Sequence, residues 1–251
     1  MTVARLVTIG ISHFCEKARW ALEWTGTPFV EEAHAPGMHL IPARRAGGRT
    51  TPILVLEREV LTDSTDILVA LDARATPARK LYPVDAALRR EALALEDTFD
   101  EKLGPAVRRA MYHLLLPHRG PAIEAMAARV PPLEKAALRA TFPVLRALMR
   151  RSMRIDAAGA ARSREVIDQV FTDVEARLAG GARYLVGDRF SAADLTFASL
   201  AAPALLVREY GAPIPGLDAS PADVAALVTQ LRETAAGAFA ARIYAEHRAC
   251  S

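Results

Sequence analysis

Ser12 and Cys15 form an S-x-x-C pattern where the first apolar segment of the chain gives way to a helical one. A helix N-terminus stabilises a thiolate, because it offers free backbone N–H groups and the positive end of the helix dipole. A serine hydroxyl at the N-cap can add one hydrogen bond to that thiolate. The pattern therefore suits a site that activates a thiol. Two plainer roles stay open: Ser12 as an N-cap only, and Cys15 as a small buried hydrophobic residue.

Two further pairs, Thr51-Pro52 and Asp63-Ser64, lie at the ends of short apolar runs. Proline is tolerated at the first residue of a strand, and its X-Pro bond is a candidate cis peptide. Asp63 and Ser64 precede a helical pattern and are good N-cap residues. The free N–H groups of that helix can receive a carboxylate. The sequence thus predicts a second helix N-terminus that is suited to an anionic ligand group.

A small α/β unit must position these pairs. The spacing of apolar residues, together with turn signals, predicts strands over 5–9, 28–32, 52–56 and 59–61. It also predicts helices over 15–24 and 64–71. Residues 36–48 are expected to form a loop with at most a short helix. Residues 74–83 carry two prolines and read as a linker, and we place the domain boundaries at 1–80 and 86–251. Everything after about Asp85 is expected to be helical. We expect breaks at Gly104-Pro105, Pro131-Pro132 and Gly180-Gly181.

One helix start in the second half is especially clear. Ser191 and Asp194 form an S-x-x-D capping box, with Phe190 placed as the hydrophobic staple. This pattern predicts a buried helix that begins at this point.

Together these motifs resemble the glutathione S-transferase superfamily, in its serine/cysteine-type bacterial form. The resemblance extends from Arg5 to about Ala204. It implies an α/β thioredoxin-like N-terminal domain followed by an all-α C-terminal domain. The stretch between Gly104 and Arg164 is some tens of residues longer than the usual two-helix hairpin. Since these helices wall the second-substrate pocket in the family, the identity of the second substrate stays open.

The resemblance also implies roles for single residues. Ser12 would donate to the thiolate of glutathione, and Thr51 and Pro52 would hold its cysteinyl backbone. Asp63 and Ser64 would bind its γ-glutamyl end. The glycine carboxylate needs a cation or an amide from the loop before Pro52. We favour Arg49 among the four basic residues available there, which are His39, Arg44, Arg45 and Arg49. Further implied positions are Tyr112 and His113 in the second-substrate pocket, Arg19 in an ion pair across the domain interface, and Trp20 in its packing.

The expected function is conjugation of glutathione to an electrophilic, largely apolar small molecule. A second possibility is a thiol transferase, reductase or dehalogenase in which Cys15 forms a mixed disulfide with glutathione. A third is a binding module without enzymatic activity on the same fold. The resemblance further implies a homodimer.

Composition excludes other classes. The chain of 251 residues is 51% hydrophobic and 24% charged, with a net charge of +3, and its scattered arginines are typical of solvated helix faces rather than of a nucleic-acid surface. Two cysteines cannot form a disulfide framework. The most apolar run, 195–207, is shorter than the ~20 residues that span a bilayer. Neither an H-E-x-x-H nor a G-x-G-x-x-G motif occurs. We therefore expect a cytoplasmic protein with no metal, nucleotide, membrane or nucleic-acid partner.

Overall fold

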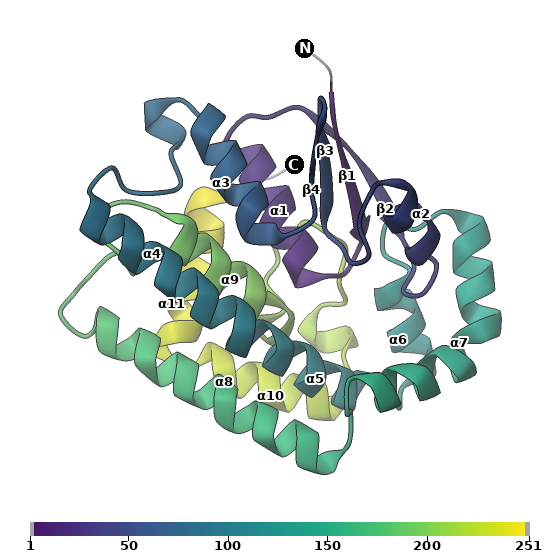
Figure 1. Ribbon diagram of the computed structural model, residues 1–251. Coiled ribbons are helices and arrows are strands. Elements are labelled where there is room, and N and C mark those ends of the chain that lie inside the picture. The colour runs from purple at the N-terminus through teal and green to yellow at the C-terminus, as the bar shows by residue number, and fades with distance from the viewer. Residues whose placement is uncertain (1–2, 249–251) are drawn as a thin grey trace.

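The computed structural model describes residues 3–248, so Cys250 lies outside the described residues. Its N-terminal half is built on a four-stranded sheet in the order β2-β1-β3-β4 (Figure 1). The strands are β1 (Ala4–Ile9), β2 (Phe29–His34), β3 (Ile53–Leu56) and β4 (Glu59–Leu61). β1 and β2 are parallel, and the β1–β3 and β3–β4 pairs are antiparallel. The helices of this half are α1 (His13–Trp24), α2 (Leu40–Arg45) and α3 (Ser64–Arg74).

Alternation along the strands separates two apolar faces. Leu6 pairs with Leu54 and Val7 with Ile53 across the β1–β3 ladder. The leucine pair belongs to the core that contains α1 and α3, whereas the valine–isoleucine pair packs with α2. Figure 1 shows α1 and α3 on one side of the sheet and α2 on the other. The predicted β-α-β-loop-β-β-α order of a thioredoxin-like domain is therefore confirmed, and the loop holds the short helix α2.

The rest of the chain is helical, as predicted. After the linker, which contains η1 (Pro77–Arg79), the helices are α4 (Ala86–Thr98), η2 (Phe99–Leu103), α5 (Gly104–Leu115), α6 (Arg119–Met126), α7 (Pro132–Ser152), α8 (Ala157–Leu178), α9 (Ala192–Leu205), η3 (Leu217–Ala219), α10 (Ala222–Arg232) and α11 (Ala235–His247). In residues 3–248, no helix is both long and apolar enough to cross a membrane.

The buried helix α9 lies at the centre of the helical half and packs against α1, α4, α5, α10 and α11. Its predicted capping box is present. The Asp194 carboxylate accepts hydrogen bonds from the Ser191 backbone N–H and hydroxyl, both at 2.8 Å, and from the Leu185 N–H at 2.8 Å. Phe190 stacks on His247 and Trp20, so this residue joins α9 to α1 and α11.

The predicted break at Gly104-Pro105 is wrong. The π-helical turn η2 carries α4 directly into α5, and proline is tolerated in the first turn of the helix that follows. Gly104 is needed here for close packing, because a Cβ at this position would lie 2.5 Å from the Phe14 ring. The predicted breaks at Pro131-Pro132 and Gly180-Gly181 are confirmed, since α7 begins at Pro132 and α8 ends at Leu178.

The lengthened middle segment forms α6 and α7, which lie beside β2 and α2 (Figure 1). They have a core of their own with Phe142, Leu138 and Ile123, and Ala35 from the α/β half belongs to it. Glu134 of α7 accepts from His34 Nδ1 at 2.8 Å and from the Ala35 N–H at 2.9 Å. The segment is thereby fixed to the end of β2.

Arg19 does not pair across the domain interface as expected. Its guanidinium contacts Glu16 and Glu31, which lie in the same half of the chain. Among the ion pairs that cross the interface is Arg248 Nε with Glu16 Oε1, at 3.0 Å. Trp20 does pack at the interface, where its indole N–H donates to the His247 carbonyl at 3.1 Å.

Candidate active site

Ser12 is the N-cap of α1, as predicted. Its Oγ accepts from the Cys15 N–H at 3.5 Å, and its own N–H donates to the Ile9 carbonyl at 2.9 Å. The side chain is half-buried and lines a large, mostly apolar cavity. A hydroxyl and a helix N-terminus therefore meet at the cavity wall, where an anionic ligand group would be stabilised.

Cys15 lies one turn inside α1 and is fully buried. Burial raises the pKa of its thiol, and hydrogen bonding with Ser12, the Ile9 backbone and Thr51 opposes this only in part. A thiol in this environment stays protonated at neutral pH. Its surroundings are those of a structural cysteine rather than of an exposed nucleophile.

The Thr51-Pro52 peptide bond is cis, which confirms the prediction. Pro52 is buried just before β3, and Thr51 is half-buried and lines the same cavity as Ser12. The two motifs, nearly forty residues apart in the chain, thus share one wall.

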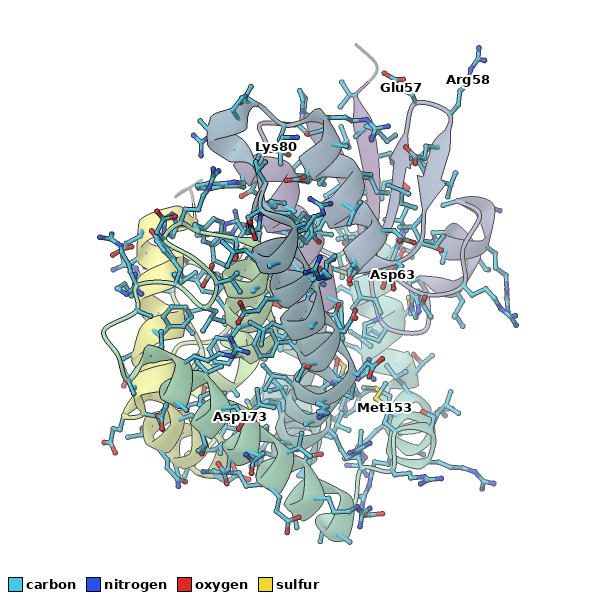
Figure 2. The ribbon with its side chains drawn as sticks, turned by 60° about the vertical axis from the view of Figure 1, so that its left-hand side comes forward. Glu57, Arg58, Asp63, Lys80, Met153 and Asp173 are labelled. Atoms are coloured by element: carbon cyan, nitrogen blue, oxygen red, sulfur yellow. The ribbon has the colours of Figure 1, made fainter. Side chains whose placement is uncertain are left out.

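Asp63 and Ser64 form the N-terminus of α3, as predicted. Asp63 is exposed, and its carboxylate accepts from the backbone N–H groups of Thr65 at 2.8 Å and Asp66 at 3.4 Å. Ser64 is buried. In Figure 2, Asp63 lies at the end of the α/β half that faces the helical half, opposite the hairpin turn of Glu57 and Arg58. Neither Asp63 nor Ser64 lines the cavity.

A buried charge cluster below the α3 N-terminus escaped the sequence reasoning. Lys17 Nζ lies 2.8 Å from Glu96 Oε1 and 2.6 Å from Asp100 Oδ2. Asp100 Oδ2 also accepts from the Thr65 hydroxyl at 3.0 Å, so the cluster links α1, α3 and the helical half. The second oxygen of Asp100 is buried without a hydrogen-bond partner among residues 3–248. Burial raises the pKa of Asp100, and Lys17 opposes that rise.

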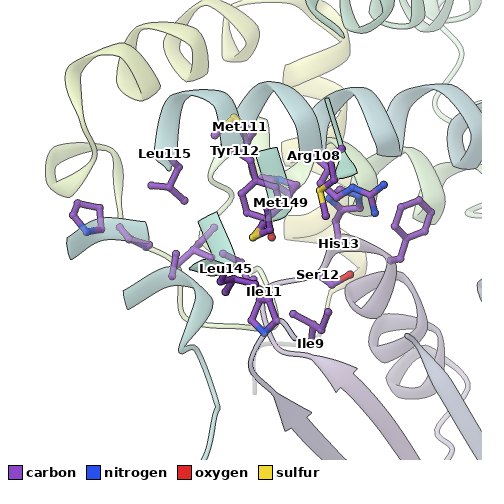
Figure 3. Close-up of a pocket in the computed structure, with 18 of the residues that line it drawn as sticks. Ile9, Ile11, Ser12, His13, Arg108, Met111, Tyr112, Leu115, Leu145 and Met149 are labelled. Atoms are coloured by element: carbon purple, nitrogen blue, oxygen red, sulfur yellow. The ribbon is translucent and has the colours of Figure 1, made fainter. Parts of the chain in front are cut away.

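The cavity has a volume of about 420 Å³. Its walls are mostly apolar side chains from β1, α5 and α7, among them Ile9, Met111, Leu145 and Met149 (Figure 3). Tyr112 lines the cavity, as expected, whereas His113 is not among its lining residues. The lengthened segment therefore forms part of the pocket wall.

The four basic candidates of the α2 region differ in position. Arg44 and Arg45 are exposed and are not among the lining residues. His39 is half-buried, lines the cavity and accepts from the Gly37 N–H at 3.1 Å. Burial lowers its pKa. Arg49, which the sequence reasoning favoured, is exposed and is not among the lining residues.

His13 and Arg108 are cavity residues that the sequence reasoning missed. Burial, with a further contribution from Arg108, lowers the pKa of His13 to about 3. The imidazole is therefore neutral at physiological pH. A signal for Arg108 did exist: it lies four positions before Tyr112, on the same face of α5.

Residues 3–248 contain no cluster of three or more His, Cys, Asp or Glu side chains that could hold a metal ion. The site is thus an apolar cavity bordered by the N-terminus of α1 and a few polar groups.

Comparison with known proteins points the same way as the geometry. The family model "Glutathione S-transferase, N-terminal domain" matches residues 6–79, and "Glutathione S-transferase, C-terminal domain" matches residues 157–234. No curated protein matches the sequence.

Solved structures share the fold at low identity. The beta-etherase LigF from Sphingobium sp. strain SYK-6 has a TM-score of 0.60 and 17% identity, over 95% of this chain and 98% of that one. Glutathione transferase F2 from Populus trichocarpa has a TM-score of 0.58 and 15% identity, over 96% of this chain and 99% of that one. A glutathione S-transferase from Methylobacterium radiotolerans JCM 2831, in complex with glutathione sulfonate, has a TM-score of 0.54 and 20% identity, over 96% of this chain and 95% of that one. The thioredoxin-like sheet, the helical half and both matched domains lead to one conclusion: the chain belongs to the glutathione S-transferase superfamily.

Proposed function

We propose that this protein is a glutathione transferase that conjugates the glutathione thiolate to an electrophilic, largely apolar small molecule. One observation carries the proposal. Ser12, at the N-terminus of α1, lines the same cavity as the apolar side chains of α5 and α7. A thiolate held at Ser12 would therefore face the second substrate directly.

The rate would come from thiolate population and from proximity. A free thiol has a pKa near ~8.5, and lowering it by about one to two units requires roughly 1.4–2.7 kcal/mol. The α1 N-terminus and the Ser12 hydroxyl together can stabilise the thiolate by about that free energy. Binding both reactants in one cavity adds the advantage of an intramolecular reaction.

The remaining groups of glutathione would be held around this point. Thr51, beside the cis Pro52, would bind the cysteinyl backbone. The γ-glutamyl carboxylate would bind at Ser64 on the α3 N-terminus. Asp63 would accept from its ammonium group, and so would the Asp100 oxygen that has no partner among residues 3–248. For the glycine carboxylate, the position of His39 in the cavity wall favours it over the exposed Arg49.

Thiol transfer through Cys15 is less well supported, because the side chain is fully buried and its thiol is held in the protonated form. A binding module without activity would keep the fold but show no thiolate at the site. We further propose that the protein is cytoplasmic and forms a homodimer, both by analogy with the family. Sedimentation equilibrium tests the homodimer.

Calorimetric titration with reduced glutathione tests the binding site. We expect micromolar to millimolar affinity in the wild type, loss of binding in Ser64→Ala, and unchanged binding in the control Thr76→Ala, which removes an exposed linker hydroxyl. Absence of binding in the wild type would contradict the transferase proposal.

Ultraviolet titration of the bound thiol tests the mechanism. In the wild type we expect a thiol pKa about one to two units below the free value, and in Ser12→Ala a rise of about one unit. Turnover should fall about 10-fold or more in that variant. A bound thiol with the free pKa, together with unchanged turnover in Ser12→Ala, would overturn the role of Ser12.

A further inference from the structure

Arg108 of α5 is an exposed residue that lines the cavity. It forms no ion pair and no side-chain hydrogen bond with any residue of the described range 3–248. It lines the apolar cavity on one side and an adjoining hollow of about 270 Å³ on the other. Ser152 and Met153 line both spaces as well, so the two adjoin at the end of α7.

The adjoining hollow carries a concentrated positive charge. Its lining residues are Pro105, Arg108, Arg109, Ser152, Met153 and Arg154. Arg109 is held by neutral partners, the Met153 carbonyl at 2.9 Å and the Ser163 hydroxyl at 3.0 Å, so its charge is not neutralised. No aspartate or glutamate is among the described residues that line either space.

A second polar group in the cavity also lacks a partner. The Nε2 atom of His13 is buried and forms no hydrogen bond with the described part of the chain, and the residue is only 4% exposed. Figure 3 shows Arg108 beside His13, with Ser12 close by. A buried polar atom without a partner is costly, and a ligand group can supply the missing hydrogen bond.

We propose that the second substrate is an amphipathic anion, whose apolar body fills the cavity while its anionic group binds Arg108 and hydrogen-bonds to His13. The inference rests on the proposed transferase function and narrows its substrate class. A guanidinium binds a carboxylate, sulfonate or phosphate through two parallel hydrogen bonds. Arg109 and Arg154 would attract the anion to this end of the cavity without touching it. Arg108 is then a specificity-determining residue rather than a catalytic one.

A matched pair of electrophiles tests the proposal by turnover. Chlorodinitrobenzene is neutral, and chlorodinitrobenzoate is the same ring with one carboxylate. In both, the glutathione sulfur forms a C–S bond to the ring carbon, the C–Cl bond breaks and chloride leaves with its electron pair. We expect Arg108→Gln to lower kcat/KM for the benzoate by about 10-fold or more, and to change that for the neutral ring by less than about 2-fold.

Two control variants separate the local effect from net charge. Arg108→Lys keeps the charge but loses the two parallel hydrogen bonds, and should retain only part of the preference for the benzoate. Arg162→Gln removes an exposed arginine of α8 away from the cavity and should leave kcat/KM unchanged for both substrates. Equal effects of Arg108→Gln on both electrophiles, or no effect on either, would overturn the proposal.

A binding assay tests the anion site independently of turnover. If the protein conjugates neither electrophile, that result counts against the transferase function, and the binding assay still tests the anion site. Anilinonaphthalene sulfonate and phenylnaphthylamine are fluorescent probes that share one apolar skeleton, but only the first is an anion. We expect the Kd of the sulfonate to rise about 10-fold in Arg108→Gln, with little change for the amine. A sulfonate Kd equal in the wild type and in Arg108→Gln would refute the anion site.

Discussion

Two residues of the first turn of α1 show how position decides reactivity. Ser12 and Cys15 are three residues apart, and Oγ of one accepts from the backbone of the other. Ser12 lines the cavity, whereas Cys15 is fully buried behind it. The same helix N-terminus can therefore stabilise an anion at Ser12 while burial keeps the Cys15 thiol neutral.

This difference predicts the behaviour of Cys15 variants. In a Cys250→Ser background, Cys15→Ala should retain conjugating activity to within about 3-fold, because the thiol touches no substrate. Before substitution, Cys15 should react slowly with a thiol reagent in the folded protein and quickly after denaturation. Fast labelling of the native protein, with loss of activity on labelling, would favour the thiol-transfer alternative.

The neutral state of His13 predicts the pH profile. Because burial and Arg108 lower its pKa to about 3, the imidazole does not titrate between about pH 5 and pH 8. The rise of kcat/KM with pH in that range should therefore report the glutathione thiol alone. We expect the midpoint of this rise to be the same in His13→Asn and the wild type, and to move upward in Ser12→Ala. A shifted midpoint in His13→Asn would show that the imidazole does titrate there.

At the scale of elements, the start of α9 depends on one buried carboxylate. Asp194 accepts three hydrogen bonds, from the backbone N–H groups of Leu185 and Ser191 and from the Ser191 hydroxyl. We expect Asp194→Ala to lower the free energy of unfolding by about 2–3 kcal/mol, because buried donors are left without partners. Denaturant titration measures the loss, and Ser220→Ala is a suitable control at a half-buried hydroxyl outside this cap. Equal stability of both variants would contradict the prediction.

The same carboxyl gives a pH-dependent signature. Burial raises its pKa to about 6 from an unfolded value of 3.8, so the folded chain binds the proton more tightly. The contribution of Asp194 to stability is then full below about pH 4 and declines as the pH rises to about 6. The stability difference between wild type and Asp194→Ala should therefore be larger at pH 4 than at pH 7. A difference that grows with pH would mean that the carboxylate is favoured in the fold.

Local patterns explain which parts of the structure could be predicted. The cap at Ser191 and Asp194, the Thr51-Pro52 pair and the N-terminus of α3 each follow from a few adjacent residues. The role of Gly104 could not be predicted, because the glycine is needed for a close approach to Phe14, ninety positions earlier. Arg108 and His13 lie far apart in the sequence and line one cavity only in the folded chain. Local signals specify elements, and tertiary contacts decide which side chains share a cavity.

At the scale of the whole molecule, the two halves share one buried interface. Glu16 of α1 is fully buried and contacts Arg19, Arg248 and the Gly211 N–H. Trp20 packs on Tyr244 with ring centroids 4.4 Å apart. The Tyr210 hydroxyl donates to the Ile11 carbonyl at 2.8 Å, next to Ser12. Because this interface also forms a wall of the site, domain separation would destroy both.

The interface predicts that the chain unfolds as one cooperative unit. Both tryptophans lie in α1, whereas far-ultraviolet circular dichroism is dominated by the helical half. The two signals should therefore give the same unfolding midpoint.

Glu16→Gln leaves two buried guanidinium groups with less compensating charge, and should lower the free energy of unfolding by about 3 kcal/mol. For a chain of this size that corresponds to about 6–12 °C in Tm. Both midpoints should fall together, while Glu246→Gln, in a surface ion pair, should leave them nearly unchanged. Separate midpoints in the wild type would show that each half folds alone, and that the cavity depends on docking rather than on a shared core.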